Sequence, residues 1–118
     1  MLALLLAAAN PLAGDWTVDL TAKARDAPYL KGMTLAPAAD GGVTGRFYDS
    51  DLQSGRWKTQ NGRTCASFRT TDGQGPYHSS VCASGGRAEG QTWAEHRNFV
   101  FVWTARPATA ADRAAKWW

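Results

Sequence analysis

Three turn motifs at regular spacing are the feature that most constrains this chain. Asn61-Gly62, Gly73-Gln74 and Gly85-Gly86 lie twelve residues apart, and such dipeptides favour the tight primed turns that join antiparallel strands. Asp40-Gly41-Gly42 is a fourth turn, and Glu95-His96-Arg97-Asn98 falls where the next one is due. The sequence therefore predicts an all-β chain whose strands are joined by hairpins.

Eight strands in an up-and-down order follow from these turns. An antiparallel sheet of that size most simply closes into a barrel, because closure removes its unpaired edges. With 118 residues there is room for one such domain, over 14–106. The alanine-rich C-terminal tail, 107–118, can add a short helix. The expected strands are 14–21, 29–36, 42–50, 52–60, 63–72, 75–84, 87–95 and 98–106.

The turn at Gly73-Gln74 fixes a register that brings the two cysteines together. With that turn as the loop, Thr71 faces Pro76 and Cys65 lies opposite Cys82. Directly opposed residues have Cβ atoms about 4.5–5.5 Å apart, close enough for a disulfide. The turn is assigned from its glycine alone, so the alignment of the cysteines supports it independently. We predict one cross-strand disulfide, Cys65–Cys82, and neither cysteine belongs to a CxxC redox or zinc motif.

The same registers sort the side chains into two faces of the sheet. One face is apolar and aromatic, and it matches large residues with small ones, Trp57 with Ala66 and Trp103 with Gly90. The other face is charged and hydroxylic, and it carries Trp93. We predict that the first face lines the interior of the barrel. A few polar groups interrupt this inner face: Thr70, Tyr77, Ser79 and Thr92.

The N-terminus resembles an export signal. Residues 1–13 are predicted to be a signal peptide, with Leu2–Ala9 as its apolar segment and cleavage near Ala9 or Ala13. A buried N-terminal strand or helix is the alternative. The apolar run is too short to span a bilayer, which needs about 20 residues. Two cysteines in a small exported chain favour an oxidising compartment, so we predict a periplasmic or secreted protein.

Charge and motif content make several function classes unfavourable. Thirteen basic and ten acidic residues leave a net charge of +3, and the basic residues are scattered, unlike those of nucleic-acid or anionic-membrane binders. The chain lacks a nucleophile elbow, a P-loop and a dinucleotide fingerprint. Its two histidines, His78 and His96, show neither HxH nor HxxxH spacing. We predict no enzyme activity, no metal site and no cofactor.

Two segments resemble known small barrels. Gly14-Asp15-Trp16 resembles the Gly-x-Trp start of lipocalin-type and avidin-type (calycin-type) barrels, in which the tryptophan closes one end. Asp40–Ser50 is similar to the second hairpin of avidins and streptavidins. The match covers about residues 14–50 and implies the eight-stranded barrel. The patterns Gly-x-Phe-Tyr-x-Ser at 45–50 and Arg-x-Phe-x-x-x-Trp-Thr-Ala at 97–105 also resemble a group of small exported bacterial proteins with no assigned activity.

The avidin-type hairpin carries a Thr-Gly-x-Tyr-x-Ser segment whose tyrosine and serine bind the ureido oxygen of biotin. Here Phe47 occupies the tyrosine position and Asp49 the serine position. Both polar contacts would then be lost or altered. A one-residue bulge would instead restore Tyr48 and Ser50. The resemblance therefore supports the barrel more than it supports biotin as the ligand.

The predicted function is the binding of a small ligand inside the barrel. An eight-stranded barrel is just wide enough to be filled by side chains or to hold one small ligand. The alternatives are a protein-interaction or protease-inhibitor-type module and a structural barrel with a filled interior. Aromatic walls exclude water from a ligand, and a few hydroxyls orient its polar atoms. The predicted site residues are Phe47, Tyr48, Asp49, Ser50, Trp57, Tyr77, Ser79, Thr92 and Trp103.

Overall fold

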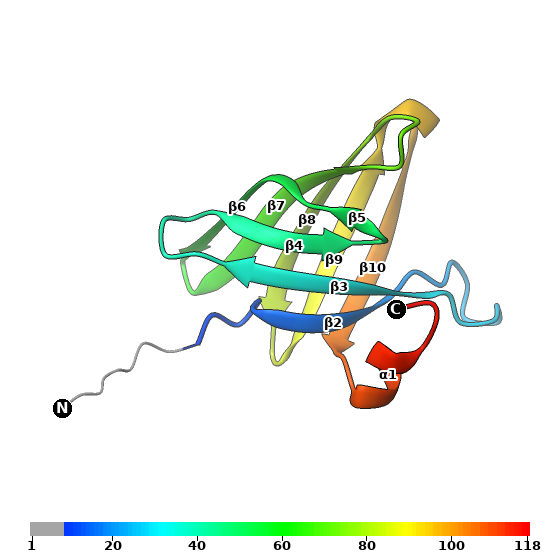
Figure 1. Cartoon of the computed structure of the whole chain (residues 1–118), viewed down its shortest axis with the longest axis horizontal. Coiled ribbons are helices and arrows are strands. Elements are labelled where there is room, and N and C mark those ends of the chain that lie inside the picture. Colours follow the sequence, from blue (N-terminus) through cyan, green and yellow to red (C-terminus); the bar gives the residue numbers. More distant parts are fainter. Residues whose placement is uncertain (1–8) are drawn as a thin grey trace.

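The computed structural model describes residues 9–118, so residues 1–8 of the predicted signal peptide lie outside the described residues. One antiparallel sheet makes up most of this part of the chain (Figure 1). Its nine strands are β2 (Gly14–Asp19), β3 (Leu30–Pro37), β4 (Val43–Phe47), β5 (Ser50–Asp51), β6 (Gln53–Gln60), β7 (Arg63–Thr71), β8 (Pro76–Ser84), β9 (Arg87–Ala94) and β10 (Phe99–Pro107). The described chain also contains a 3-10 turn, η1 (Glu95–Arg97), and an α-helix, α1 (Ala110–Ala114).

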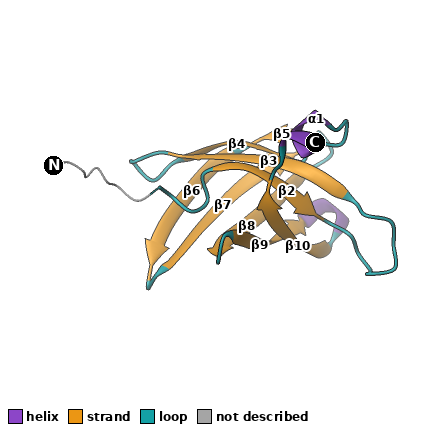
Figure 2. Ribbon diagram, turned by 90° about the horizontal axis from the view of Figure 1, so that it is seen from below, coloured by secondary structure: helices purple, strands orange, loops and turns teal. Residues whose placement is uncertain are grey.

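The sheet curves into a nearly closed barrel (Figure 2). Its strand order is β5-β4-β3-β2-β10-β9-β8-β7-β6, so the first long strand pairs with the last. The edge strands β5 and β6 are separated only by Leu52, and β6 returns to the start of β4. There Gly42 bridges Arg56, and the N–H of Trp57 donates to the carbonyl of Gly41 at 2.9 Å. The predicted all-β antiparallel barrel is confirmed.

The predicted number of strands, eight, is wrong. The expected strand 42–50 ends at Phe47, because the chain turns back at Tyr48 and Asp49, both with positive φ (53° and 66°). Phe47 then pairs with Ser50, and the two-residue strand β5 lies against β4. This hairpin has two residues in its loop, like an Asn-Gly turn, but it contains no glycine. Left-handed backbone is uncommon for tyrosine, so the residue types did not indicate the turn.

The hairpin registers around the disulfide are as predicted. Cys65 pairs with Cys82 across β7 and β8, and the two form a disulfide. Asn61-Gly62 and Gly85-Gly86 are two-residue loops with positive φ throughout. The β7–β8 loop is longer than predicted, because the ladder stops at the pair Thr71–Pro76 and leaves four residues unpaired.

Successive side chains on each strand point to opposite faces of the sheet, and those on one face form the core. Trp103 is buried over Gly90, where a Cβ would lie 2.4 Å from its ring, so only glycine fits there. Trp57 pairs with Ala66 and is half-buried against the core. Trp93 is 38% exposed, which confirms its predicted place outside the barrel. The predicted inner face is therefore the buried face of β7 to β10.

The C-terminal tail folds back onto the outside of the barrel beside β2 and β3. Helix α1 begins with a capping box, in which Thr109 and Asp112 each accept the other's backbone N–H. The indole N–H of Trp118 donates to the carbonyl of Trp16 in β2 at 3.1 Å. Among residues 9–118, α1 is the only α-helix, and no helix there is long and apolar enough to cross a membrane.

Candidate functional site: the mouth of the barrel

The two ends of the barrel differ. At one end, which we call the closed end, Leu12 is completely buried and the indole N–H of Trp57 donates to the carbonyl of Ala38 at 2.7 Å. The other end, which we call the mouth, opens into a cavity of about 450 Å³. The chain between β2 and β3, the β4–β5 turn, the β7–β8 loop and η1 surround this mouth (Figure 1).

Aromatic rings form most of the walls of the mouth. Tyr29 and Tyr48 meet edge to face, with ring centroids 6.0 Å apart. Phe99 and Phe101 of β10 lie with centroids 5.5 Å apart. Tyr77 of β8 adds a fifth ring. Alternation brings Phe99 and Phe101 to the inner face, because residues two apart on a strand point to the same side. The walls of the cavity are therefore largely apolar.

The floor of the mouth is a packed and hydrogen-bonded layer. Phe47 is buried there, with its ring centroid 5.2 Å from that of Trp103. The hydroxyl of Thr92 accepts a hydrogen bond from the indole N–H of Trp103 at 2.9 Å. It also shares a hydrogen bond with Ser79 at 2.8 Å. Ser79 and Trp103 thus lie beneath the floor with their polar groups satisfied, and they close the cavity from below.

Two groups of opposite charge stand at the rim. The carboxylate of Asp72 accepts from the hydroxyl of Tyr77 at 2.7 Å and from the backbone N–H of Gln74 at 2.8 Å. These bonds, the tyrosine's above all, lower the pKa of Asp72 below its ordinary value, so it stays ionised at neutral pH. The guanidinium of Arg97 lies over the ring of Phe99, 4.8 Å from its centroid. The polar groups of the mouth are thus concentrated at its entrance.

The structure brings together five of the nine predicted site residues. Ser79 and Trp103 lie below the floor instead. Asp49 points outward and pairs with Lys31 at 2.6 Å, and Trp57 lies at the closed end. The five residues that line the mouth are Phe47, Tyr48, Ser50, Tyr77 and Thr92.

Several lining residues were not among the predicted ones. Phe99 and Phe101 have the same strand parity as Trp103, so the alternation of faces could have identified them. Tyr29 begins the predicted strand 29–36 and has the same parity as the buried Met33 and Leu35, so alternation could have identified it too. Arg97 lies in η1, where no periodic pattern indicates which way a side chain points, and it could not have been found from the residue pattern alone.

Neither histidine lines the cavity of the mouth. His78 is on the outside of β8, where its Nε2 is 2.8 Å from a carboxylate oxygen of Glu95. His96 packs edge-on against Tyr77, with ring centroids 5.0 Å apart. Within residues 9–118, no three His, Cys, Asp or Glu side chains form a group that could hold a metal ion.

Comparison with protein-family models, with curated protein sequences and with solved structures gives no match for this chain. A functional proposal must therefore rest on the geometry of the barrel and its mouth.

Proposed function

We propose that this protein binds a small, largely apolar molecule in the mouth of its barrel. The observation that carries this proposal is the cavity of about 450 Å³, with aromatic walls and polar groups at its entrance. Its volume falls in the range of small-molecule sites, about 300–1,000 Å³, and its lining has the usual division between apolar walls and a few polar groups. A structural barrel would have this space filled by side chains.

The aromatic and the charged lining residues have different roles in the proposed binding. The rings of Tyr29, Phe99 and Phe101 remove the apolar body of the ligand from water, which is favourable by about 25 cal/mol for each Å² buried. Asp72 and Arg97 at the rim orient polar ends of the ligand that reach the entrance. Two hydrogen bonds hold the carboxylate of Asp72 in place, so its negative charge has a fixed position at the entrance. We propose a binding role and no catalytic one.

The β4–β5 turn supports the proposal and bears on biotin. Tyr48 and Ser50, which flank the turn residue Asp49, both line the mouth. The hydroxyl of Ser50, however, donates to the carbonyl of Thr71 at 2.9 Å. It can therefore only accept a further hydrogen bond, whereas the ureido oxygen of biotin requires a donor. We propose a ligand other than biotin, in a barrel related to the avidin or lipocalin type.

The disulfide supports a place of action outside the reducing cytosol. Cys65 and Cys82 are bonded, and such bonds persist in oxidising compartments. We propose that the protein is exported to the periplasm or secreted.

A metabolite panel that includes biotin, screened by thermal shift, tests the proposed site. A ligand at one hundred times its Kd should stabilise the fold by about 2.7 kcal/mol. Ala22 lies in the chain between β2 and β3 and lines the mouth, so Ala22→Trp should obstruct entry and abolish the shift. Ala36→Trp, on the exposed side of β3, is the matched control and should leave the shift unchanged.

Two outcomes would overturn this assignment. A ligand whose shift survives Ala22→Trp binds somewhere other than the mouth. A broad panel without any stabilising compound would favour the alternative of an interaction or inhibitor-type module.

A further inference from the structure

The outer surface of β6 to β9 carries a second depression of about 450 Å³. We call it the outer hollow, and its position follows from the strand registers. Ser67 of β7 pairs with Ser80 of β8, and these two short side chains form the centre. Arg56 lies beyond Ser67 on β6, and Gln91 lies beyond Ser80 on β9. Long side chains around short ones produce the concavity.

The neighbouring row of side chains forms one wall of the outer hollow. Arg69, His78 and Trp93 are cross-strand neighbours on β7, β8 and β9. Trp93 is 38% exposed, a large fraction for a tryptophan on a sheet. The wall thus places a guanidinium and an accessible indole ring about two strand spacings apart, roughly 10 Å.

The charge of the outer hollow is positive. Its lining includes Arg56 and Arg69 and contains no Asp or Glu. The carboxylate of Glu95 lies 2.8 Å from His78 and outside the lining, so the two arginine charges exceed its single negative charge. Arg56 donates one hydrogen bond to the carbonyl of Asp40 at 3.2 Å. Arg69 takes part in none of the ion pairs formed among residues 9–118, so its planar donor group is available to an anion.

We propose that the outer hollow binds an acidic saccharide, a sugar that carries a carboxylate. The guanidinium of Arg69 can donate two parallel hydrogen bonds to the carboxylate. The hydroxyls of Ser67 and Ser80 and the amide of Gln91 can bond the sugar hydroxyls. The exposed ring of Trp93 offers a flat surface to the apolar face of the sugar ring. An acidic peptide would use the arginines but has no need of a tryptophan beside a floor of hydroxyls.

The outer hollow and the mouth are separate sites. The outer hollow lies on the outward side of β6 to β9, whereas the mouth opens at one end of the interior. Saccharide binding is therefore independent of ligand binding in the mouth. Ala22→Trp should leave it unchanged, so either proposal can fail alone.

Isothermal titration with trigalacturonic acid tests the outer hollow. The uncharged analogue galactotriose and the acidic peptide triglutamate are the comparison ligands. We expect trigalacturonic acid to bind, and Arg69→Gln to weaken it about 10- to 100-fold, since hydrogen bonds to charged groups are worth that much. Trp93→Ala should also weaken it. Arg87→Gln is the matched control, because Arg87 lies further along β9 and outside the hollow, and it should bind like the wild type.

Several results would overturn the proposal. Trigalacturonic acid that fails to bind at millimolar concentration contradicts it directly. Triglutamate that binds as tightly would show that charge alone is recognised. Equal losses in Arg69→Gln and Arg87→Gln would show attraction to the whole surface. Both substitutions are at exposed positions, and thermal melts of each variant establish that the fold is retained.

Discussion

At the scale of single residues, one hydroxyl links three buried side chains. Thr92 is fully buried, and its oxygen accepts from Trp103 while sharing a hydrogen bond with Ser79. Three polar groups in an apolar interior thereby satisfy one another. Such groups are costly to bury without partners. This layer supports the floor of the mouth, so its order matters to the proposed site.

Replacing Thr92 by valine should destabilise the protein by about 1–3 kcal/mol, because the indole N–H of Trp103 would stay buried without an acceptor. Valine has the same shape as threonine, so packing is nearly unchanged. Thr104→Val, on the exposed side of β10, is the control and should change stability by less than about 0.5 kcal/mol. Urea denaturation measures both. Equal midpoints for the two variants would contradict this role of Thr92.

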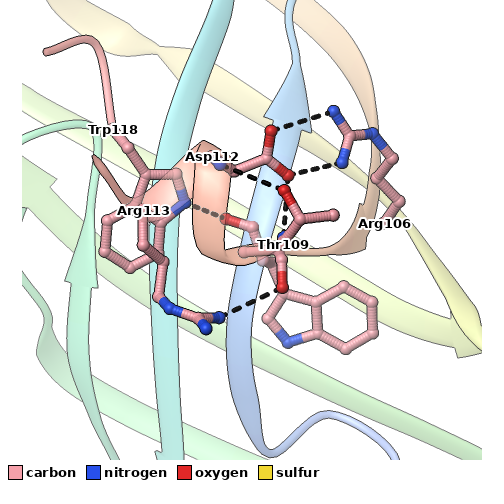
Figure 3. A network of polar contacts seen from close by, with 7 residues as sticks. Arg106, Thr109, Asp112, Arg113 and Trp118 are labelled. Atoms are coloured by element: carbon pink, nitrogen blue, oxygen red, sulfur yellow. Dashed lines mark hydrogen bonds and ion pairs between the residues drawn. The ribbon is translucent and has the colours of Figure 1, made fainter. Parts of the chain in front are cut away.

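At the scale of elements, the C-terminal tail depends on contacts with the barrel. Helix α1 has only five residues, and helices that short do not form alone in water. Its N-terminus is fixed by the capping box of Thr109 and Asp112, and Arg106 of β10 donates two hydrogen bonds to the carboxylate of Asp112 (Figure 3). Arg113 donates to the carbonyl of Ala108 at 3.1 Å. The tail is thus tied to β10 largely through one carboxylate.

This carboxylate should make the stability of the protein fall in acid. The hydrogen bonds from Arg106, and then the cap, lower the pKa of Asp112 well below its ordinary value of about 3.9. A lowered pKa in the folded state contributes stability that is complete above about pH 4 and is lost as the pH falls toward the folded pKa. Urea denaturation across this range should show a smaller acid loss for Asp112→Asn than for the wild type. Asp72 also has a lowered pKa, but it is present in both the wild type and the variant, so its contribution is the same in both. An equal loss of unfolding free energy in acid for the two proteins would contradict the prediction.

The end of the tail rests on a glycine of β3. A Cβ added at Gly32 would lie 2.5 Å from the backbone oxygen of Trp118 and 2.6 Å from its ring. Gly32→Ala should therefore displace Trp118 and destabilise the full chain by about 1–3 kcal/mol, the range for overpacking. In a chain that ends at Trp117, the same substitution should have little effect. A double-mutant cycle in urea isolates the contact, and equal costs in both chains would show that Trp118 does not explain the loss.

The sequence allowed the elements to be predicted where a residue type determines the backbone or the spacing. Asn61-Gly62 and Gly85-Gly86 supply residues that accept positive φ, so their hairpins and registers were correct. The register that paired Cys65 with Cys82 was also correct, because the four-residue loop 72–75 is centred on the predicted turn at Gly73-Gln74. The turn at Tyr48-Asp49 was missed, because pairing between β4 and β5 imposes it against the backbone preference of tyrosine.

The candidate site could be predicted only in part, for a related reason. Residues on regular strands, such as Tyr77 and Thr92, were assigned correctly to the interior by alternation. The position of a residue along the barrel axis depends on the stagger of all the strands. Trp57 was therefore assigned to the correct side of the sheet but to the wrong end of the barrel. Residues on connections, such as Arg97 in η1, follow no such alternation.

At the scale of the whole molecule, the barrel is closed at one end and open at the other. The segment before β2 forms part of the closure. Leu12 is completely buried, the indole N–H of Trp16 donates to its carbonyl at 2.9 Å, and its own N–H donates to the side chain of Asn10 at 2.9 Å. The segment therefore both fills the closed end and satisfies a buried indole. Within residues 9–118, the mouth is therefore the open end by which the proposed ligand would enter.

The folded barrel should therefore require the segment that begins at Asn10. Leu12→Ala should cost about 2–5 kcal/mol, the range for a buried leucine, whereas Pro11→Ala, at an exposed position, should cost little. A chain that begins at Gly14 should lose more than Leu12→Ala does, because Trp16 also loses its acceptor, at about 1–3 kcal/mol. Of the two predicted cleavage positions, Ala9 and Ala13, only the first retains Leu12. Urea denaturation of chains beginning at Asn10 and at Gly14 decides the matter, and equal stability of the two would show that the barrel closes without this segment.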